Sequence, residues 1–593
     1  MLPLRMFLNG LQNLAVVEEL REFIRDEFDH QRNRFRKHIG LSLEERIERF
    51  ICFAGLEFKK IDQHGRAGFR HSGNDSRLRE GDLVRLSRNG SPDEWQRASI
   101  YREEDGEIWL ASESHFSVSH FERMGFDDWI LDEDFLDLEG FYLDALSRVE
   151  TTTIGQERIL TLLAGEAEPG ADEEAYAEAW SDLEEADTPW EDAQKQAIAG
   201  CLAADHCYLV QGPPGTGKTR ALAETVRQLV ERGERVLITA FTNRAIDNAL
   251  SATAREIGDR SRVARFTPPI HRRDENYDSY ETFADSPLME TEGGWVAGAT
   301  PFALRKRLSG VEFDAIVIDE AGQMTTPLAI MAMLAGPKYL LFGDQKQLGP
   351  VVVSRPRCEI KDLGIFHALR QQTPDGTTLD VTYRLNEHLV HWPSENFYGG
   401  ELRSAEPARG RRLAWSRPSG VPDFIAEALA PENSVVWIPC DHAASRTSSE
   451  AEIEIALELL KALQTGGVPY SSVAVVTPYR RQGLTLRRRL QAIDRTGTWR
   501  DCVIDTVERM QGQEREVIIL SMCASDSDFV RRQADFLFDP RRLNVSATRA
   551  RTKLVILASE DLLHANLDET DQYEDRDLFA SLCRAAVKLD PHF

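Results

Sequence analysis

The N-terminal residues change from a helical pattern of apolar side chains to a strand-like one. Between residues 12 and 40 apolar side chains recur every three or four positions with charged residues between them, which predicts an amphipathic helix. Ser42 and Glu45 have the spacing of a capping box and predict the start of a second helix. From Gly81 to Ser112 short β-like runs are separated by Asn-Gly and Asp-Gly turns, so we expect a small antiparallel barrel or sheet there.

Three aromatic residues fall within these short runs, namely Trp95, Tyr101 and Trp109. Such rings could stack on nucleic-acid bases or fill the centre of a small barrel. Because the core is the commoner place for aromatic side chains in a small barrel, we expect all three to be core residues.

A strongly acidic segment follows. From Glu166 to Asp192 there are twelve Asp or Glu residues and no Lys or Arg. Such a composition is typical of a solvated connector or of an acidic helix, and we assign it no chemistry.

After this segment apolar strand-like runs alternate with helical ones, which predicts parallel sheets with helices on both faces. Candidate strands form two blocks and end at Val210, Ala240, Ile318 and Phe342, then at Thr477, Ser521 and Leu557. Pro and Gly residues between Val352 and Thr382 indicate a boundary between the blocks. We therefore expect an α/β protein divided into N-terminal helices with a β-barrel in 1–150, an acidic connector in 151–192, two α/β lobes in 193–365 and 366–565, and an acidic tail with a short helix in 566–593.

The overall composition narrows the class of protein only slightly. Of the 593 residues 42% are hydrophobic, an ordinary share for a globular protein. No apolar run approaches the length of about 20 residues that crosses a bilayer, and no signal peptide is predicted, so we expect a soluble protein without a membrane partner. The eight cysteines are scattered without zinc-type spacing, which fits reduced thiols in a cytoplasmic protein. The formal charge of −27 argues against a generally basic coat, but it leaves room for a local basic channel.

The most informative stretch is rich in glycine and lies between an apolar run and a helical pattern. From Gly212 its spacing fits G-x-x-x-x-G-K-[ST], in which backbone N–H groups close around phosphate oxygens. In that motif Lys218 reaches the β- and γ-phosphates and Thr219 is a ligand of Mg²⁺. A simple Gly/Pro turn is the alternative, and the strand–loop–helix context disfavours it. The expected phosphate-binding residues are Gly212, Pro213, Pro214, Gly215, Thr216, Gly217, Lys218 and Thr219.

Two further polar groups follow predicted buried strands. Asp319 and Glu320 come directly after the apolar run 313–318, at the end of a strand where open α/β sheets bind ligands. Asp319 can hold Mg²⁺, and Glu320 can orient or deprotonate the attacking water. Gln347 follows the next such run, where its amide could contact a γ-phosphate; a plain loop is the alternative.

The order of these motifs resembles that of the superfamily 1 helicases. The sequence Asp-Glu-Ala-Gly-Gln at 319–323 is similar to the form found in the branch that contains the nonsense-mediated decay helicase, the immunoglobulin mu-binding helicase and the replication nuclease-helicase. The run Asn396-Phe397-Tyr398-Gly399-Gly400 is also typical of that branch. The resemblance implies two tandem RecA-like P-loop domains that use ATP and Mg²⁺, preceded by a helical stalk and a small β-barrel.

The resemblance also implies roles for residues that composition and spacing leave unassigned. Gln194 would read adenine, and Arg384 and Arg549 would reach ATP from the second lobe as arginine fingers. The other nucleotide-binding residues that it implies in the second lobe are Tyr383, Gly512 and Glu514. Its nucleic-acid contacts would be Thr242, Asn243, Thr300, Thr477, Pro478, Tyr479 and Thr506.

These resemblances imply an ATP-dependent helicase or translocase on single-stranded nucleic acid, with DNA slightly favoured over RNA and with 5′-to-3′ movement. The alternative is an ATP-gated clamp or remodeller of ribonucleoproteins that does not unwind. A basic run from Arg480 to Arg489 could line the nucleic-acid path or form the solvated face of a helix. No zinc or nuclease module is predicted, so we expect the target to be chosen either by a protein partner or by the cellular context.

Overall fold

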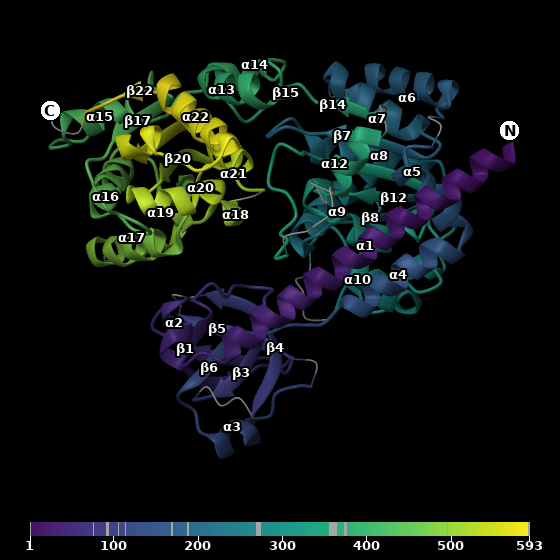
Figure 1. The fold of residues 1–593 in the computed structure, drawn as a ribbon, viewed down its shortest axis with the longest axis horizontal. Helices are drawn as coiled ribbons and strands as arrows, with labels where there is room; N and C mark the ends of the chain where they lie inside the picture. Colours follow the sequence, from purple (N-terminus) through teal and green to yellow (C-terminus); the bar gives the residue numbers. More distant parts are fainter. Residues whose placement is uncertain are drawn as a thin grey trace.

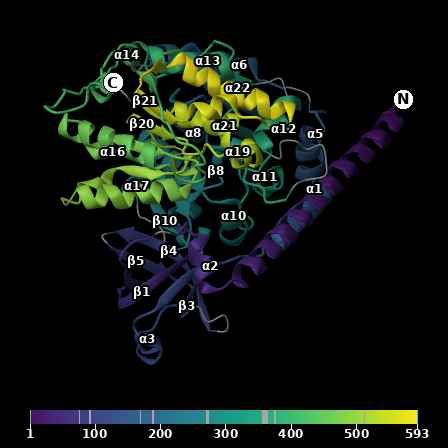
Figure 2. The ribbon, with the colours of Figure 1, turned by 60° about the vertical axis from the view of Figure 1, so that its left-hand side comes forward.

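The computed structural model describes residues 2–74, 76–89, 94–104, 106–112, 114–167, 170–186, 189–268, 274–354, 364–372, 376–494, 496–510 and 512–590. Figure 1 shows two α/β lobes side by side and a small barrel below them. The long helix α1 (Leu2–Ile39) runs from beside the first lobe down to the barrel. Figure 2 shows the barrel again below the lobes after the molecule is turned.

The N-terminal barrel is closed and antiparallel, with the strand order β1-β2-β5-β4-β3-β6. Its strands are β1 (Cys52–Ile61), β2 (Ala67–Arg70), β3 (Leu83–Arg88), β4 (Trp95–Glu104), β5 (Glu107–Ala111) and β6 (Trp129–Glu133). Ser42 forms the predicted capping box with Glu45 at the start of α2 (Leu43–Glu48). The sequence pattern predicts only β3, β4 and β5, because a register shift between Phe58 and Lys60 interrupts the alternation along β1.

The aromatic residues of the barrel do not all fill its core. Trp95 is 38% exposed and carries the guanidinium of Arg85 at 3.9 Å from its ring centre. The Tyr101 ring is half-buried beneath Arg66 at 4.1 Å. The prediction that these two are core residues is therefore wrong, because both lie on the outer face of β4, and only Trp109 is buried.

Helix α1 packs against the first lobe through its middle turns. Val17, Leu20 and Phe28 are buried in one hydrophobic cluster with residues of α4 (Glu139–Thr151). Glu27 accepts hydrogen bonds from the backbone N–H groups of Val353 at 3.0 Å and Ser354 at 2.7 Å. The helix that carries the barrel is thus fixed to a loop of the first lobe.

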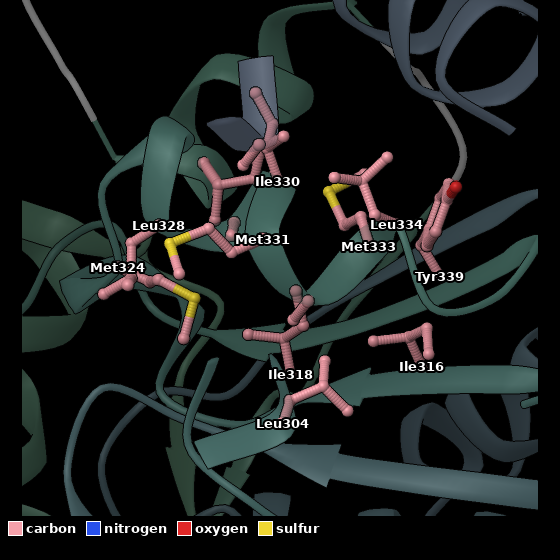
Figure 3. Packing of buried hydrophobic residues seen from close by; sticks show 14 of the residues in the cluster. Leu304, Ile316, Ile318, Met324, Leu328, Ile330, Met331, Met333, Leu334 and Tyr339 are labelled. Carbon is pink, nitrogen blue, oxygen red and sulfur yellow. The ribbon is translucent and has the colours of Figure 1, made fainter. Parts of the chain in front are cut away.

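The first lobe is built on an eight-stranded parallel sheet in the order β10-β9-β11-β8-β12-β13-β7-β14. The strands are β7 (Cys207–Gln211), β8 (Arg235–Thr239), β9 (Val263–Phe266), β10 (Asp278–Tyr280), β11 (Trp295–Gly298), β12 (Ala315–Ile318), β13 (Lys338–Gly343) and β14 (Gly376–Thr378). Its helices are α5 (Thr161–Leu163), α6 (Glu173–Glu185), α7 (Asp192–Ala203), α8 (Lys218–Glu231), α9 (Asn243–Ile257), α10 (Pro301–Arg307), α11 (Thr326–Met333) and α12 (Ile365–Gln372). Figure 3 shows side chains of α11 such as Ile330 and Met331 above Ile316 and Ile318 of β12.

The second lobe is a six-stranded parallel sheet in the order β19-β18-β20-β21-β17-β22. Its strands are β17 (Val435–Pro439), β18 (Val473–Val476), β19 (Val503–Asp505), β20 (Arg515–Ser521), β21 (Ala550–Ala558) and β22 (Val587–Lys588). Its helices are α13 (Glu387–Phe397), α14 (Glu406–Arg409), α15 (Asp423–Leu429), α16 (Glu450–Thr465), α17 (Arg480–Ile493), α18 (Val507–Met510), α19 (Ser527–Arg532), α20 (Ala534–Leu537), α21 (Pro540–Ala547) and α22 (Thr570–Ala585). A short parallel pair, β15 (Val381–Thr382) with β16 (Arg403–Ser404), lies near the start of this lobe.

Three segments pack differently from the division that the sequence predicts. Ala179 and Leu183 of α6 are buried with α7, so the acidic segment includes a docked helix. Strand β14 pairs with β7, so residues 376–378 belong to the first sheet although they lie beyond the expected boundary. Helix α22 buries Phe579 in the second lobe and β22 pairs with β17, so the expected tail completes that lobe. Within the described chain no helix is both long and apolar enough to cross a membrane.

Candidate nucleotide site and nucleic-acid interface

The glycine-rich loop lies between β7 and α8 and has a backbone that needs glycine. Gly215 has φ +76° and Gly217 has φ +82°, a region that residues with a Cβ rarely adopt. A Cβ at Gly217 would also lie 2.6 Å from the side-chain nitrogen of Gln194. This geometry fits a phosphate cradle, because glycines without a Cβ let the loop backbone come close to an anion.

Lys218 begins α8 and pairs with both strand-end carboxylates of β12. Its Nζ lies 2.7 Å from Glu320 and 3.0 Å from Asp319. Burial alone would lower the pKa of Lys218, but the two carboxylates outweigh it and raise this pKa. Burial raises the pKa of Asp319 even beside the lysine. Lys218 would therefore have to leave these carboxylates in order to reach a phosphate, which would expose both to a metal ion or a water.

The donor set at this point fits Mg²⁺. The Thr219 hydroxyl and the Asp319 carboxylate are hard oxygen ligands, and phosphate oxygens with waters usually complete such a shell. Glu320 has the left-handed backbone angle φ +49°, which is uncommon for a residue other than glycine. In this backbone conformation the Glu320 carboxylate accepts hydrogen bonds from Lys218 Nζ and, at 3.0 Å, from Gln323 Nε2.

Gln347 lies in the loop after β13 and contacts the second lobe. Its Nε2 donates to Asp344 at 2.8 Å, and its Oε1 accepts from the Arg549 guanidinium at 2.7 Å. Arg549 is 2% exposed. Burial lowers the pKa of Arg549 to about 9, and the like charge of Arg384 adds to the fall. Two arginines that repel each other at a buried site would be stabilised by a polyanion such as a triphosphate.

The start of the second lobe rests directly on the phosphate loop. The Tyr383 N–H donates to the Gly215 carbonyl at 2.8 Å, and the Thr382 hydroxyl donates to the Pro214 carbonyl at 2.7 Å. Arg384 is thereby held beside the loop, where its Nε pairs with Glu514 at 2.7 Å. Next to Glu514, Gly512 has φ +72°, which again favours glycine.

The expected adenine contact Gln194 is buried behind the loop. Its Nε2 donates to the Thr216 carbonyl at 2.9 Å, so the amide supports the phosphate loop from α7. The Tyr383 hydroxyl donates to Glu191 at 2.8 Å, and the ring itself is 39% exposed. An exposed aromatic beside the loop is a plausible surface for a base to stack on.

The residues expected to contact nucleic acid fall into two groups. Thr242 and Thr300 cap α9 and α10, accepting from Ala245 N and Ala303 N at 3.2 Å each. Asn243 is exposed and accepts from Arg265 at 2.6 Å. These residues of the first lobe lie at helix starts, which are favourable places for phosphate groups.

The second-lobe group is less open. Thr477 is 1% exposed and Thr506 is 7% exposed, so both side chains are buried. Tyr479 packs on Phe529 and Phe536 with ring centres 5.5 Å away in each case. Pro478 between Thr477 and Tyr479 is half-buried. The sequence places these residues correctly at strand ends. Because the two threonine side chains are buried, it is mainly the backbone that could contact a nucleic acid there.

Two features of this face are missing from the sequence-based expectation. Phe241 is 47% exposed directly before the α9 cap, and its position at the end of an apolar strand is the signal that could have identified it. An arginine cluster also forms where the barrel meets the second lobe: the Arg509 guanidinium donates to the Arg77 carbonyl at 3.5 Å and pairs with Asp82 at 3.8 Å. Burial lowers the pKa of Arg480, and the charges of Arg79 and Arg509 nearby contribute.

The arginines of the basic run in α17 lie in two different environments. Arg487 pairs with Asp505 at 3.5 Å and donates to the Ile504 carbonyl, on the side of the arginine cluster. Arg489 instead pairs with Glu450 of α16. Arg489 therefore lies on an exposed face of the helix, and a role of the run along a nucleic-acid path stays a prediction.

Curated relatives match part of the chain rather than all of it. The DNA replication ATP-dependent helicase/nuclease dna2 of Schizosaccharomyces pombe is 28% identical over 399 residues, which cover 63% of this chain and 28% of the relative. The regulator of nonsense transcripts 1 homolog of Drosophila melanogaster is 29% identical, over 60% of this chain and 33% of that protein. The uncharacterized ATP-dependent helicase MJ0104 of Methanocaldococcus jannaschii is 26% identical, over 64% of this chain and 69% of that protein. The chain thus spans less than a third of the length of the first curated relatives that it matches.

Two parallel sheets joined at a phosphate loop define a protein with tandem RecA-like P-loop lobes. Family models described as AAA domain match residues 189–278 with 297–355 and residues 362–561, and together they cover more than half of the chain. The chain belongs to the superfamily 1 helicases, in the 1B-like branch. Members of this family are ATP-hydrolysing enzymes.

Proposed function

We propose that this chain hydrolyses ATP between its two lobes and uses the cycle to move along, and to unwind, a nucleic acid held as a single strand. The observation that carries the proposal is the direct contact of Arg549 with Gln347 at 2.7 Å, beside the Lys218 and Glu320 pair. A residue of the second lobe thereby reaches the loop of the first lobe that follows β13. Hydrolysis and relative movement of the lobes would then be one event.

The proposed roles follow from the side chains themselves. Lys218 would leave its carboxylates and bind the β- and γ-phosphates, and the glycine loop would cradle them through backbone N–H groups. Mg²⁺ held by Thr219 and Asp319 would neutralise phosphate charge. Glu320, released from Lys218, would orient the attacking water and accept its proton. Arg384 and Arg549 would stabilise the charge that spreads over the γ-phosphate in the transition state.

The proposed substrate is a single strand, with DNA favoured over RNA. Thr242, Asn243 and Thr300 would contact its backbone in the first lobe. Phe241 would stack on a base, an interaction that tolerates any sequence. The printed names of the relatives include both a DNA replication helicase and a regulator of nonsense transcripts, which supports either nucleic acid. We propose movement from 5′ to 3′ and a protein partner that selects the target.

The test is ATP hydrolysis by the whole chain with and without single-stranded DNA or RNA of equal length. We expect stimulation by both, larger with DNA, and none in Glu320→Gln. Duplexes with a single 5′ or 3′ tail then report unwinding and its direction. Absence of nucleic-acid-stimulated hydrolysis would contradict the proposal. Hydrolysis without strand displacement from either duplex would favour a nucleotide-gated clamp.

A further inference from the structure

Asp344 is a buried carboxylate at which the two lobes meet. It follows β13 and is 4% exposed. Its oxygens accept four hydrogen bonds, from the Gln211 side chain at 3.3 Å, Lys346 N at 3.0 Å, Gln347 Nε2 at 2.8 Å and the Tyr398 hydroxyl at 2.8 Å. Three of these donors belong to the first lobe. Only Tyr398 comes from the second lobe.

Tyr398 is buried at the end of α13 and is itself held by a second residue of its lobe. Its ring is 7% exposed. Asn544 of α21 donates one hydrogen bond to the Tyr398 hydroxyl at 3.0 Å and another to the Lys346 carbonyl at 2.8 Å. Because a carboxylate can only accept, the Tyr398 proton must point to Asp344, and the tyrosine oxygen is left to accept from Asn544. The donor and the acceptor are therefore fixed for both hydrogen bonds of the Tyr398 hydroxyl, the one to Asp344 and the one from Asn544.

The same carboxylate fixes the amide of Gln347. Its nitrogen must face Asp344, since an amide oxygen would meet an acceptor there. The Gln347 oxygen is then turned toward Arg549, from which it accepts at 2.7 Å. Asn544 and Arg549 are five positions apart in the same segment of the second lobe. That segment thus contacts the 344–347 loop twice, through Arg549 on the Gln347 oxygen and through Asn544 on the Lys346 carbonyl.

We propose that Tyr398 is a positioning residue that anchors the second lobe on Asp344 and thereby holds Gln347 and Arg549 in the arrangement needed for ATP hydrolysis. This inference rests on the proposed function of the site. Among the described residues the Tyr398 hydroxyl is hydrogen-bonded to Asp344 and Asn544, neither of which is expected to bind phosphate, so its effect would pass through Asp344. The hydrogen bond from Tyr398 to Asp344 would stay in place while the Arg549 guanidinium leaves the Gln347 oxygen and binds a phosphate. It would keep the relative position of the two lobes unchanged during that step.

The simpler alternative is that the Tyr398 ring only fills the hydrophobic cluster that it shares with Leu389 and Leu402. Tyr398→Phe separates the two roles, because it keeps the ring and removes only the hydroxyl. Tyr339 provides a matched control in the first lobe. Its side chain is fully buried, and within the described part of the protein its hydroxyl has no hydrogen-bond partner.

The experiment compares steady-state ATP hydrolysis by the wild-type chain, Tyr398→Phe and Tyr339→Phe, each with saturating single-stranded DNA, and follows thermal unfolding of each. We expect Tyr398→Phe to lower kcat about tenfold, as for the loss of one hydrogen bond to a buried carboxylate. The KM for ATP should change by less than about twofold, because the anchor acts on the bound complex. In an Asp344→Ala background, Tyr398→Phe should have less than about a twofold further effect, since residues that act in series are not additive.

Three outcomes would overturn the inference. One is a kcat of Tyr398→Phe within about twofold of wild type, well short of the expected loss. A second is an equal fall in Tyr339→Phe, and a third is a fall that appears only in KM. A wild-type chain without stimulated hydrolysis would instead contradict the proposed function, and it would be recognised before any variant is compared.

Discussion

At the nucleotide site charged side chains are buried and bonded to one another, whereas the first-lobe residues assigned to nucleic acid are exposed at helix starts. Lys218 pairs with two carboxylates, and Arg549 is 2% exposed against Gln347. By contrast, Thr242 and Asn243 are exposed, and Phe241 is 47% exposed. Both regions are proposed to bind a polyanion. The first would do so through buried, paired charges and the second through exposed polar and aromatic side chains.

The difference teaches where single substitutions should act strongly. In the buried site each residue is the partner of another, so removing one leaves a second charge unpaired at a cost of several kcal/mol. On the exposed face each contact adds a modest amount to affinity and water can replace it. Three experiments test this contrast, and a fourth tests a buried charge elsewhere in the second lobe.

The largest effect is expected from Lys218→Ala. The variant removes the phosphate contact and also leaves Asp319 and Glu320 without their cation, so stimulated ATP hydrolysis should fall by more than the roughly 10³-fold that the loss of an arginine finger costs. Steady-state hydrolysis measures this, with Lys461→Ala on the exposed face of α16 as control. Turnover near the wild-type rate in Lys218→Ala would refute the site.

Arg549→Ala should follow closely. An arginine finger can contribute about 10³-fold or more to kcat, and binding of ATP depends on it less. We expect kcat to fall by that order while the Kd for a fluorescent ATP analogue stays within about fivefold, which separates transition-state from ground-state contacts. Arg531, which pairs with Asp528 at 3.2 Å on the surface, gives the matched arginine control. A similar loss in Arg531→Ala would remove the distinction.

Phe241→Ala tests the exposed face. Loss of one stacked base should weaken single-strand binding by about 1–3 kcal/mol, or roughly tenfold to a hundredfold. Fluorescence anisotropy with a labelled oligonucleotide measures the Kd. Phe126, a loop residue near the barrel that is 48% exposed, is the matched aromatic. Equal binding by Phe241→Ala and wild type would leave the face without its proposed stacking residue.

Lys553 offers a buried charge outside both regions. Burial lowers its pKa to about 7, and its Nζ donates to the carbonyls of Ala430 and Asn433. Because the unfolded chain holds this proton up to a higher pH, the folded state gains stability as pH rises above 7, by at most about 1.4 kcal/mol per unit. Thermal unfolding between pH 7 and 9 should therefore show a steeper rise for wild type than for Lys553→Met. Parallel curves would contradict this linkage.

The sequence located the parts of the site that depend on local backbone geometry. The glycine loop and the carboxylates after β12 are defined within a few residues, so their spacing alone predicts what they are. Contacts between distant segments leave no such pattern. Tyr398 reaches Asp344 across 54 positions, and Glu27 reaches Ser354 across 327, so neither contact could be derived from periodicity.

The fold could be predicted from the sequence to a similar extent. Continuous apolar runs identified the central strands of both sheets, since those strands are buried on both faces. Edge elements such as β14 and β22 have three and two residues and carry too little pattern to recognise. The outward position of Trp95 also escaped prediction, because a large aromatic ring covered by Arg85 resembles a core residue in sequence.

The attachment of α1 at Glu27 makes this helix a lever. The part of α1 from Glu27 to its end at Ile39 is about 18 Å long at 1.5 Å per residue, and the barrel follows this end of the helix. A tilt of about 10° around that attachment would swing the barrel end by about 3 Å, since a helix of this kind bends little. Glu27 is bonded to the segment that continues from Gln347, so a movement of the barrel would be transmitted to the loop that follows β13.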